Sequence, residues 1–227
     1  MSVADHGTFL KRLKNQGYQF DVIYDVGANI GAWSCEVQEI FPNSKFELFE
    51  PLVGKNEDLD SLSRFSELAK HQLHVVALSD ENEEGKIKVL GNKGVGSSIL
   101  ILEADYRKET TWRNISIVKM DSYVEKNDLS LPDFIKLDTQ AAELKVLKGA
   151  INCLEKCQFV LLETWLRRVY GPETPLFHET ANFLYENNYC LYEILSTEEG
   201  RDPDGTLRWF DAVFINKAYS KKPNHLL

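Results

Sequence analysis

The stretch VIYDVGANIG at residues 22–31 sets the fold class of this chain. Residues 22–26 form a short apolar run that predicts a buried strand, and the run stops at Gly27. Apolar side chains then recur at helical spacing up to Pro42, at Ile30, Trp33, Val37, Ile40 and Phe41. The stretch therefore predicts a strand, a tight glycine turn and a helix whose first amides face that turn.

The same alternation of strand and helix continues on the C-terminal side of this unit. Apolar runs predict strands at 46–49, 74–78, 134–137 and 159–162, and helical periodicity falls at 59–68, 143–154 and 177–184. Two late strands, at 189–195 and 209–215, flank a polar loop at 198–205 and predict an antiparallel hairpin at the sheet edge. We expect a doubly wound α/β sheet with helices on both faces, the late hairpin and a small β insertion.

The expected domain organisation is a single domain over residues 1–227. Residues 1–20 are interpreted as an N-terminal helical extension and residues 217–227 as a flexible tail. Between them, residues 81–120 break the alternation, with strand-like stretches at 86–90 and 115–120 around the turn-rich segment 91–98. This region is predicted to be an antiparallel insertion or flap over the main sheet.

Composition excludes several classes of protein. Hydrophobic residues make up 43% of the chain and charged residues 27%, as in ordinary globular domains, which excludes disordered chains, collagen and disulfide mini-proteins. A net charge of -9 disfavours a nucleic-acid partner. No apolar run is long enough to cross a bilayer, and the four cysteines form neither a CxxC pair nor a zinc-type cluster. We therefore expect a cytoplasmic protein with reduced cysteines, no membrane contact and no metal.

The turn at residues 25–31 is the first candidate binding site. Its glycines are spaced GxxxG, whereas a dinucleotide fingerprint requires GxGxxG. An acid at the start of the turn disfavours a pyrophosphate and suits an ammonium group, which favours a nucleotide that carries an amino acid. The alternative is a purely structural glycine turn. Cofactor contacts are predicted at Asp25, Gly27, Ala28, Asn29 and Gly31.

Polar residues also end the next two strands. Glu50, followed by Pro51, ends the second strand, where a carboxylate can accept two hydrogen bonds from a ribose diol. Ser79 and Asp80 end the third strand, where they can meet the edge of an adenine ring. The alternative for Glu50 is a solvated acid at a strand end.

With these residues in place, the chain resembles the FkbM-type S-adenosylmethionine-dependent methyltransferases. The resemblance rests on DVGANIGAW at 25–33, FEP at 49–51, ALSD at 77–80, GSS at 96–98, IKLDTQAAELKVLKGA at 135–150 and LLET at 161–164. One position departs from the family, which usually has Gly after the Gln, where this chain has Ala141. The resemblance implies a Rossmann-like methyltransferase sheet, S-adenosyl-L-methionine as cofactor, and O-methylation of a hydroxyl on a sugar or small natural product.

Three residues are candidates for catalysis, namely Asp138, Gln140 and Glu163. Asp138 ends the fourth strand, where it can take the acceptor proton or orient the donor; alternatively it caps the helix that starts near Glu143. Gln140 is placed to orient the acceptor, and Glu163 either touches the acceptor or pairs with a nearby arginine. His178 is a second possible base. Four aromatic side chains are expected to line an acceptor pocket or to pack in the core, namely Trp165, Tyr170, Phe177 and Trp209.

Two other classes of function stay open from the sequence. A nicotinamide-dependent oxidoreductase is disfavoured by the missing GxGxxG pattern and by Asp25. A non-catalytic adenosine-binding module requires Glu50 but not Asp138. The expected partner is a small-molecule or carbohydrate acceptor, and neither its identity nor the oligomeric state follows from the sequence.

Overall fold

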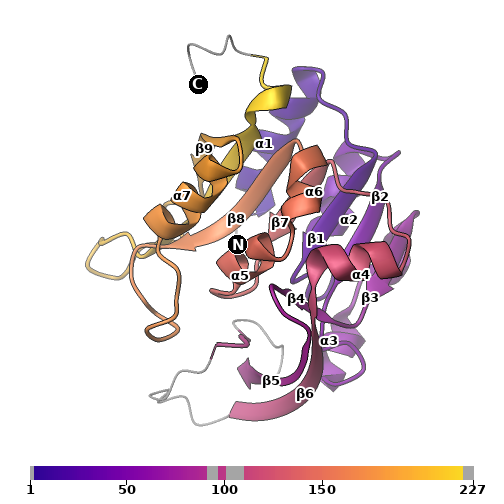
Figure 1. Cartoon of the computed structure of the whole chain (residues 1–227), viewed down its shortest axis with the longest axis vertical. Coiled ribbons are helices and arrows are strands. Elements are labelled where there is room, and N and C mark those ends of the chain that lie inside the picture. The colour runs from indigo at the N-terminus through magenta and orange to yellow at the C-terminus, as the bar shows by residue number, and fades with distance from the viewer. Residues whose placement is uncertain (1–2, 91–96, 101–109, 222–227) are drawn as a thin grey trace.

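The computed structural model describes residues 3–90, 97–100 and 110–221 and has a mixed α/β architecture (Figure 1). Within these residues, seven strands form the large sheet in the order β3-β2-β1-β7-β8-β10-β9. Neighbouring strands from β3 to β8 are parallel, and β10 is antiparallel to both of its neighbours. The bounds are β1 Val22–Val26, β2 Lys45–Phe49, β3 His71–His74, β7 Phe134–Leu137, β8 Phe159–Trp165, β9 Tyr189–Leu195 and β10 Trp209–Asn216.

Helices cover both faces of this sheet, as the sequence predicts (Figure 1). One apolar core joins the sheet to α1 (Val3–Asn15) and α2 (Ala32–Ile40). A second core lies on the opposite face, under α4 (Met120–Lys126), α5 (Glu143–Lys148), α6 (Ile151–Lys156) and α7 (Phe177–Glu186). The remaining described helices are the short α3 (Glu57–Leu62), η1 (Phe65–Glu67) and η2 (Lys217–Tyr219).

A second, three-stranded sheet lies at one end of the molecule (Figure 1). Its order is β4-β6-β5, with β4 Ala77–Ser79, β5 Glu83–Leu90 and β6 Thr110–Lys119. β5 and β6 are antiparallel, while β4 and β6 are parallel. Apolar side chains of β5 and β6, such as Ile87 and Ile117, pack against Leu52, which follows β2. The small sheet is therefore attached to the region just past the end of β2.

Three predicted elements are divided in the structure. The strand expected at 74–78 is wrong: β3 ends at His74 beside β2, and the chain then bends so that Ala77–Ser79 pairs with β6 in the other sheet. The helix expected at 59–68 is also divided, because the backbone at Ser63 is extended after α3. The helix expected at 143–154 breaks at Gly149 and Ala150, where a Cβ on Gly149 would lie 1.9 Å from the Ser79 carbonyl oxygen.

The other expected strands and the edge hairpin are confirmed, since β10 joins β8 to the edge strand β9. Most of the predicted turn-rich segment 91–98 and most of the expected tail 217–227 lie outside the described residues. Within the residues that the structure describes, no helix combines the length and the apolar character that crossing a membrane requires.

Candidate active site

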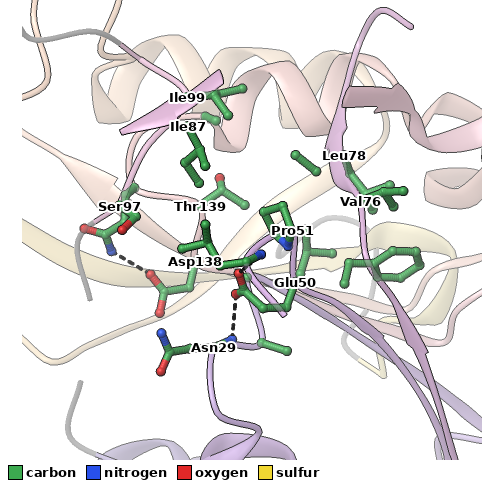
Figure 2. Close-up of a pocket in the computed structure, with 18 of the residues that line it drawn as sticks. Asn29, Glu50, Pro51, Val76, Leu78, Ile87, Ser97, Ile99, Asp138 and Thr139 are labelled. Carbon is green, nitrogen blue, oxygen red and sulfur yellow. Dashed lines mark hydrogen bonds between the residues drawn. The ribbon is translucent and has the colours of Figure 1, made fainter. Parts of the chain in front are cut away.

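A cavity of about 320 Å³ opens at the carboxyl ends of β1, β2 and β7. Ligands of doubly wound sheets bind at this edge, because the strand ends and the following helix N-termini meet there. Its polar wall includes Asn29, Glu50 and Asp138, which lie near one another in Figure 2. Its apolar wall includes Leu78 from β4 and Ile87 from β5, so both sheets contribute to the lining.

The glycines of the turn after β1 allow other parts of the chain to approach closely. Gly27 has φ +76°, and a Cβ on it would lie 2.0 Å from the carbonyl oxygen of Asp138. Gly31 has φ +79°, and a Cβ there would lie 2.7 Å from the Phe65 ring. Gly27, Ala28 and Asn29 line the cavity, whereas Gly31 is not among the described lining residues. Both glycines are therefore required by the fold around the cavity.

Asp25 is fully buried, and its partners belong to the protein itself. One carboxylate oxygen accepts from the Lys136 ammonium at 2.9 Å, and the other accepts from the Ser34 hydroxyl at 2.7 Å. Lys136 also donates to the Gly27 carbonyl oxygen at 3.0 Å. Burial lowers the pKa of Lys136, but the carboxylates of Asp25 and Asp138 outweigh that effect and raise its pKa. The ammonium group beside Asp25 is therefore that of Lys136, and Asp25 is not among the described lining residues.

Glu50 faces the cavity from the end of β2. One carboxylate oxygen accepts from the backbone N–H of Asn29 at 2.9 Å (Figure 2). The other accepts from the backbone N–H of Leu52 at 2.9 Å. Burial raises the pKa of Glu50. Each carboxylate oxygen has a second lone pair, so the oriented side chain can still accept from a ligand hydroxyl.

A single amide joins two of the candidate catalytic carboxylates. Gln140 Nε2 donates to Asp138 Oδ1 at 2.8 Å and to Glu163 Oε2 at 3.2 Å. The Tyr170 hydroxyl, from the loop after β8, donates to Gln140 Oε1. Because that bond uses the amide oxygen, both N–H bonds of the amide are directed at the carboxylates. Asp138 and Gln140 line the cavity, and Glu163 lies behind them in contact with Gln140.

Glu143 stabilises the turn that carries Asp138 and Gln140. Its Oε1 accepts from Thr139 N at 2.8 Å, from Thr139 Oγ1 at 3.0 Å and from Ala141 N at 3.3 Å. Burial raises the pKa of Glu143 to about 7. These hydrogen bonds make Glu143 a cap on the turn before α5.

The remaining predicted site residues are divided between the cavity wall and other parts of the described structure. Ser79 is buried and its hydroxyl donates to Asp80 Oδ1 at 3.1 Å, while the cavity wall here is formed by Val76, Ala77 and Leu78. Pro51 lies on the wall beside Glu50. His178 is exposed on α7. Of the four aromatic candidates, Phe177 packs on Phe210, and the remaining three gather around Ala141, namely Trp165, Tyr170 and Trp209.

Lys136 and Trp33 are among the cavity-wall residues that were not predicted from the sequence. Lys136 is a charged residue inside an apolar strand, and this signal was available in the sequence. Its ammonium lies 5.8 Å from the centre of the Trp33 ring. The part of the chain that the structure describes contains no group of three or more His, Cys, Asp or Glu side chains able to hold a metal ion.

Comparisons with known proteins point to one family. The model of the methyltransferase FkbM domain matches residues 25–193. Among curated proteins, hexuronic acid methyltransferase AglP of Haloferax volcanii is 25% identical over 155 residues, which is 68% of this chain. The chain spans 60% of the length of that relative.

Two solved structures have a similar fold. Methyltransferase FkbM from Methylobacillus flagellatus superposes with a TM-score of 0.51 and 17% identity, over 86% of this chain and 43% of that chain. An O-methyltransferase family protein from Burkholderia thailandensis gives a TM-score of 0.50 and 8% identity, over 95% of this chain and 56% of that chain. These likenesses show the fold, which is the Rossmann-like fold expected from the sequence.

Proposed function

Since the chain belongs to the FkbM methyltransferase family, we propose that it transfers a methyl group from S-adenosyl-L-methionine to a hydroxyl group of a sugar or small natural product. The observation that carries this proposal is that Glu50 and Asp138 face the same cavity. These two carboxylates follow β2 and β7, the strands on either side of β1, and face one cavity beside the turn at 27–29.

The cofactor side of the proposed site is the part around Glu50. The carboxylate is held by the backbone N–H groups of Asn29 and Leu52, so it is already oriented to accept hydrogen bonds from a ribose diol. The apolar wall formed by Leu78 and Ile87 suits a flat heterocycle. Asp25 and Lys136 support this side indirectly, because their ion pair holds β1 and β7 together beneath the turn.

The charges on the cavity wall favour a hydroxyl acceptor. Glu50 and Asp138 are acidic, and Lys136, the basic side chain among the described lining residues, pairs with Asp25 at 2.9 Å and lies 3.7 Å from Asp138. A carboxylate acceptor would meet these acids without a free cation to balance it. A hexuronic acid, which the name of the curated relative contains, has both hydroxyl and carboxylate groups. We propose that this chain uses a hydroxyl of its acceptor.

Asp138 is proposed to accept the proton of that hydroxyl. When bound, S-adenosyl-L-methionine supplies an electrophilic methyl group on a sulfonium sulfur. As the methyl–sulfur bond breaks and the methyl–oxygen bond forms, the hydroxyl proton moves to the Asp138 carboxylate. Gln140 holds that carboxylate in place by its 2.8 Å hydrogen bond. Most of the acceleration is then expected from alignment of the acceptor oxygen with the methyl carbon.

Calorimetric titration of one preparation with S-adenosylhomocysteine and with NAD tests the proposed cofactor. We expect binding of S-adenosylhomocysteine and none of NAD; the reverse result would favour an oxidoreductase. On an identified acceptor, Asp138→Asn should lower turnover by roughly 10²- to 10⁴-fold, the range for acid–base groups, with a much smaller change in cofactor affinity. Full turnover by this variant would remove Asp138 from its proposed role, and binding without turnover in the wild type on every acceptor tried would favour a binding module.

A further inference from the structure

His6, on the N-terminal helix α1, lies buried between two other elements of the fold. Its ring Nδ1 is 3.2 Å from the indole Nε1 of Trp33, which lines the cavity from α2. Its Nε2 is 2.9 Å from Oδ2 of Asp211 on β10. Both His6 and Asp211 lie outside residues 25–193, which match the family model. Through His6, the cavity-wall residue Trp33 is therefore connected to two residues that the family model does not cover.

The partners of His6 determine where its proton lies. The indole N–H of Trp33 can only donate, so Nδ1 of His6 must accept. The remaining ring proton is then on Nε2, which donates to Asp211 Oδ2. In this form the imidazole is neutral, so it orients the Asp211 carboxylate without cancelling its charge. The other oxygen, Asp211 Oδ1, is buried and has no hydrogen-bond partner among the described residues.

Glu163 lies directly opposite Asp211 in the antiparallel pair of β8 and β10. Residues opposite each other in such a pair point to the same face, with Cβ atoms about 4.5–5.5 Å apart. Both side chains are buried, at 7% and 1% exposure. Burial raises the pKa of Glu163 well above its usual range, and the charges of Asp138 at the end of β7, Glu143 on α5 and Asp211 on β10 add to that effect.

We propose that His6 is a positioning residue that decides which carboxylate of the Glu163–Asp211 pair holds a proton. By donating to Asp211 Oδ2, His6 stabilises the ionised form of Asp211. Glu163 then holds the proton of the pair, and the unpartnered Asp211 Oδ1 is available to accept a hydrogen bond from it. Asp138 lies across the Gln140 amide from Glu163, since Gln140 donates to both carboxylates.

The consequence for function rests on the proposed methyltransferase activity. A neutral Glu163 leaves Asp138 as the proton acceptor closest to the acceptor hydroxyl. It also limits the negative charge next to a cationic sulfonium. The proton position itself does not depend on any ligand, so it can be measured on the protein alone.

Carboxyl-carbon NMR of the ligand-free protein, titrated with acid and base, reads the proton position. Glu163→Gln and Asp211→Asn assign the two signals. At pH 7 we expect a protonated Glu163 and an ionised Asp211 in the wild type. His6→Leu removes the donor to Asp211, so the proton should move to Asp211 and Glu163 should become ionised. His6→Gln, whose amide can both accept from Trp33 and donate to Asp211, should restore the wild-type arrangement.

Two results would overturn the proposal: an ionised Glu163 in the wild type at pH 7, or a protonated Glu163 in a folded His6→Leu variant. If His6→Leu does not fold, Asp211→Asn decides, because loss of that charge should lower the Glu163 midpoint by about one unit or more. An unchanged Glu163 midpoint in Asp211→Asn would also overturn it.

A second measurement links the proton position to the cofactor. At pH 7, His6→Leu should bind cationic S-adenosylmethionine several-fold better relative to neutral S-adenosylhomocysteine than the wild type does, and His6→Gln should not. An unchanged ratio in His6→Leu would overturn the functional consequence. If the wild type binds neither ligand, the proposed function fails, while the NMR titration still decides the role of His6.

Discussion

Two consecutive residues after β7, Gln140 and Ala141, have left-handed backbone conformations, with φ of 55° and 79°. L-amino acids other than glycine adopt this region at a cost of about 1–2 kcal/mol each. The conformation is held by hydrogen bonds on both sides, from the Ser98 hydroxyl to the Gln140 carbonyl oxygen and from Ala141 N to Glu143. The sequence resemblance implies glycine at this position in most of the family, whereas this chain has Ala141 in a left-handed conformation.

Glycine at position 141 should relieve that strain. Ala141→Gly and Ala142→Gly both remove a buried methyl group, but Ala142 has an ordinary φ of -94°. We therefore expect Ala141→Gly to be more stable than Ala142→Gly by about 1–2 kcal/mol, measured by urea denaturation. Equal stability of the two variants would show that the turn at Ala141 carries no strain.

Removal of the Glu50 carboxylate should weaken cofactor binding. Hydrogen bonds to a charged acceptor contribute ~1.5–3 kcal/mol each, so Glu50→Ala should lower S-adenosylhomocysteine affinity at least about tenfold, measured by calorimetry. Glu39→Ala, an exposed acid on α2, is the matched control and should bind as the wild type does. A 2′,3′-dideoxy analogue that binds the wild type as tightly as the parent compound would contradict the ribose assignment.

The start of α5 depends on a buried acid instead of an ordinary cap. The residue before the helix, Ala142, has no side chain that can accept a hydrogen bond, and Glu143 reaches back to the preceding turn instead. Its pKa of about 7 means that the folded protein binds more protons than the unfolded chain between about pH 4.5 and pH 7. The contribution of Glu143 to stability is therefore present at low pH and lost as the pH rises through 7.

Glu143→Gln should reduce this pH dependence. Between pH 5 and pH 8 the wild type should lose up to about 3 kcal/mol more unfolding free energy than the variant, since one pKa unit corresponds to about 1.4 kcal/mol. Glu155→Gln, an exposed acid on α6, is the control and should follow the wild type. Identical pH profiles for wild type and Glu143→Gln in chemical denaturation would contradict the raised pKa.

Helices and strands whose signal lies within a short stretch of sequence were predictable. The breaks that divide some of them were not, because distant contacts set those breaks. The unit β1–turn–α2 has its strand, glycine and apolar helix face within about twenty residues. By contrast, the run His74–Leu78 is apolar across the bend between β3 and β4, and the bend depends on pairing with β6, whose partner residues lie about forty positions away. The periodicity of 143–154 likewise continues through the break at Gly149, which is set by contact with Ser79.

The candidate site likewise has features that could be predicted from the sequence and features that could not. The positions of Glu50 and Asp138 on one cavity follow from their places at the ends of parallel strands. The partner of Asp25 could not be read from the sequence, because Lys136 is 111 positions away. His6 and Asp211 are 205 positions apart, and neither belongs to a motif. Long-range pairing of single polar side chains leaves no periodic signal.

At the scale of the whole molecule, the cavity lies where the two sheets meet. Glu50 and Asp138 come from the large sheet, and Leu78 and Ile87 from the small one. α1 is joined to β10 by the contact of His6 with Asp211 and to α2 by that with Trp33. We propose on these contacts that residues 1–227 form one domain, in which the small sheet is an insertion that closes one side of the cavity.

A ligand that fills this cavity should stabilise both sheets together. At a hundredfold excess over its Kd, S-adenosylhomocysteine should add about 2.7 kcal/mol to the unfolding free energy. Hydrogen exchange should slow for amides of β4 and β5 as well as for the turn at 27–31, because both contribute to the lining. NAD at the same concentration is the control. If exchange slowed only for amides of the large sheet, the proposal that the small sheet closes one side of the ligand site would be contradicted.

The position of β10 between β8 and β9 has a consequence for the order in which the protein is made. During translation, β8 leaves the ribosome before β10 and has no partner on that edge until residues 209–216 follow. Asp211, which contacts His6 and lies opposite Glu163, arrives with that same late strand. The helix α1 is synthesised before β1, yet His6 meets its carboxylate partner only after β10 has been made. A nascent chain arrested before β10 would therefore expose the apolar edge of β8, and chaperones that hold such edges would act in that interval.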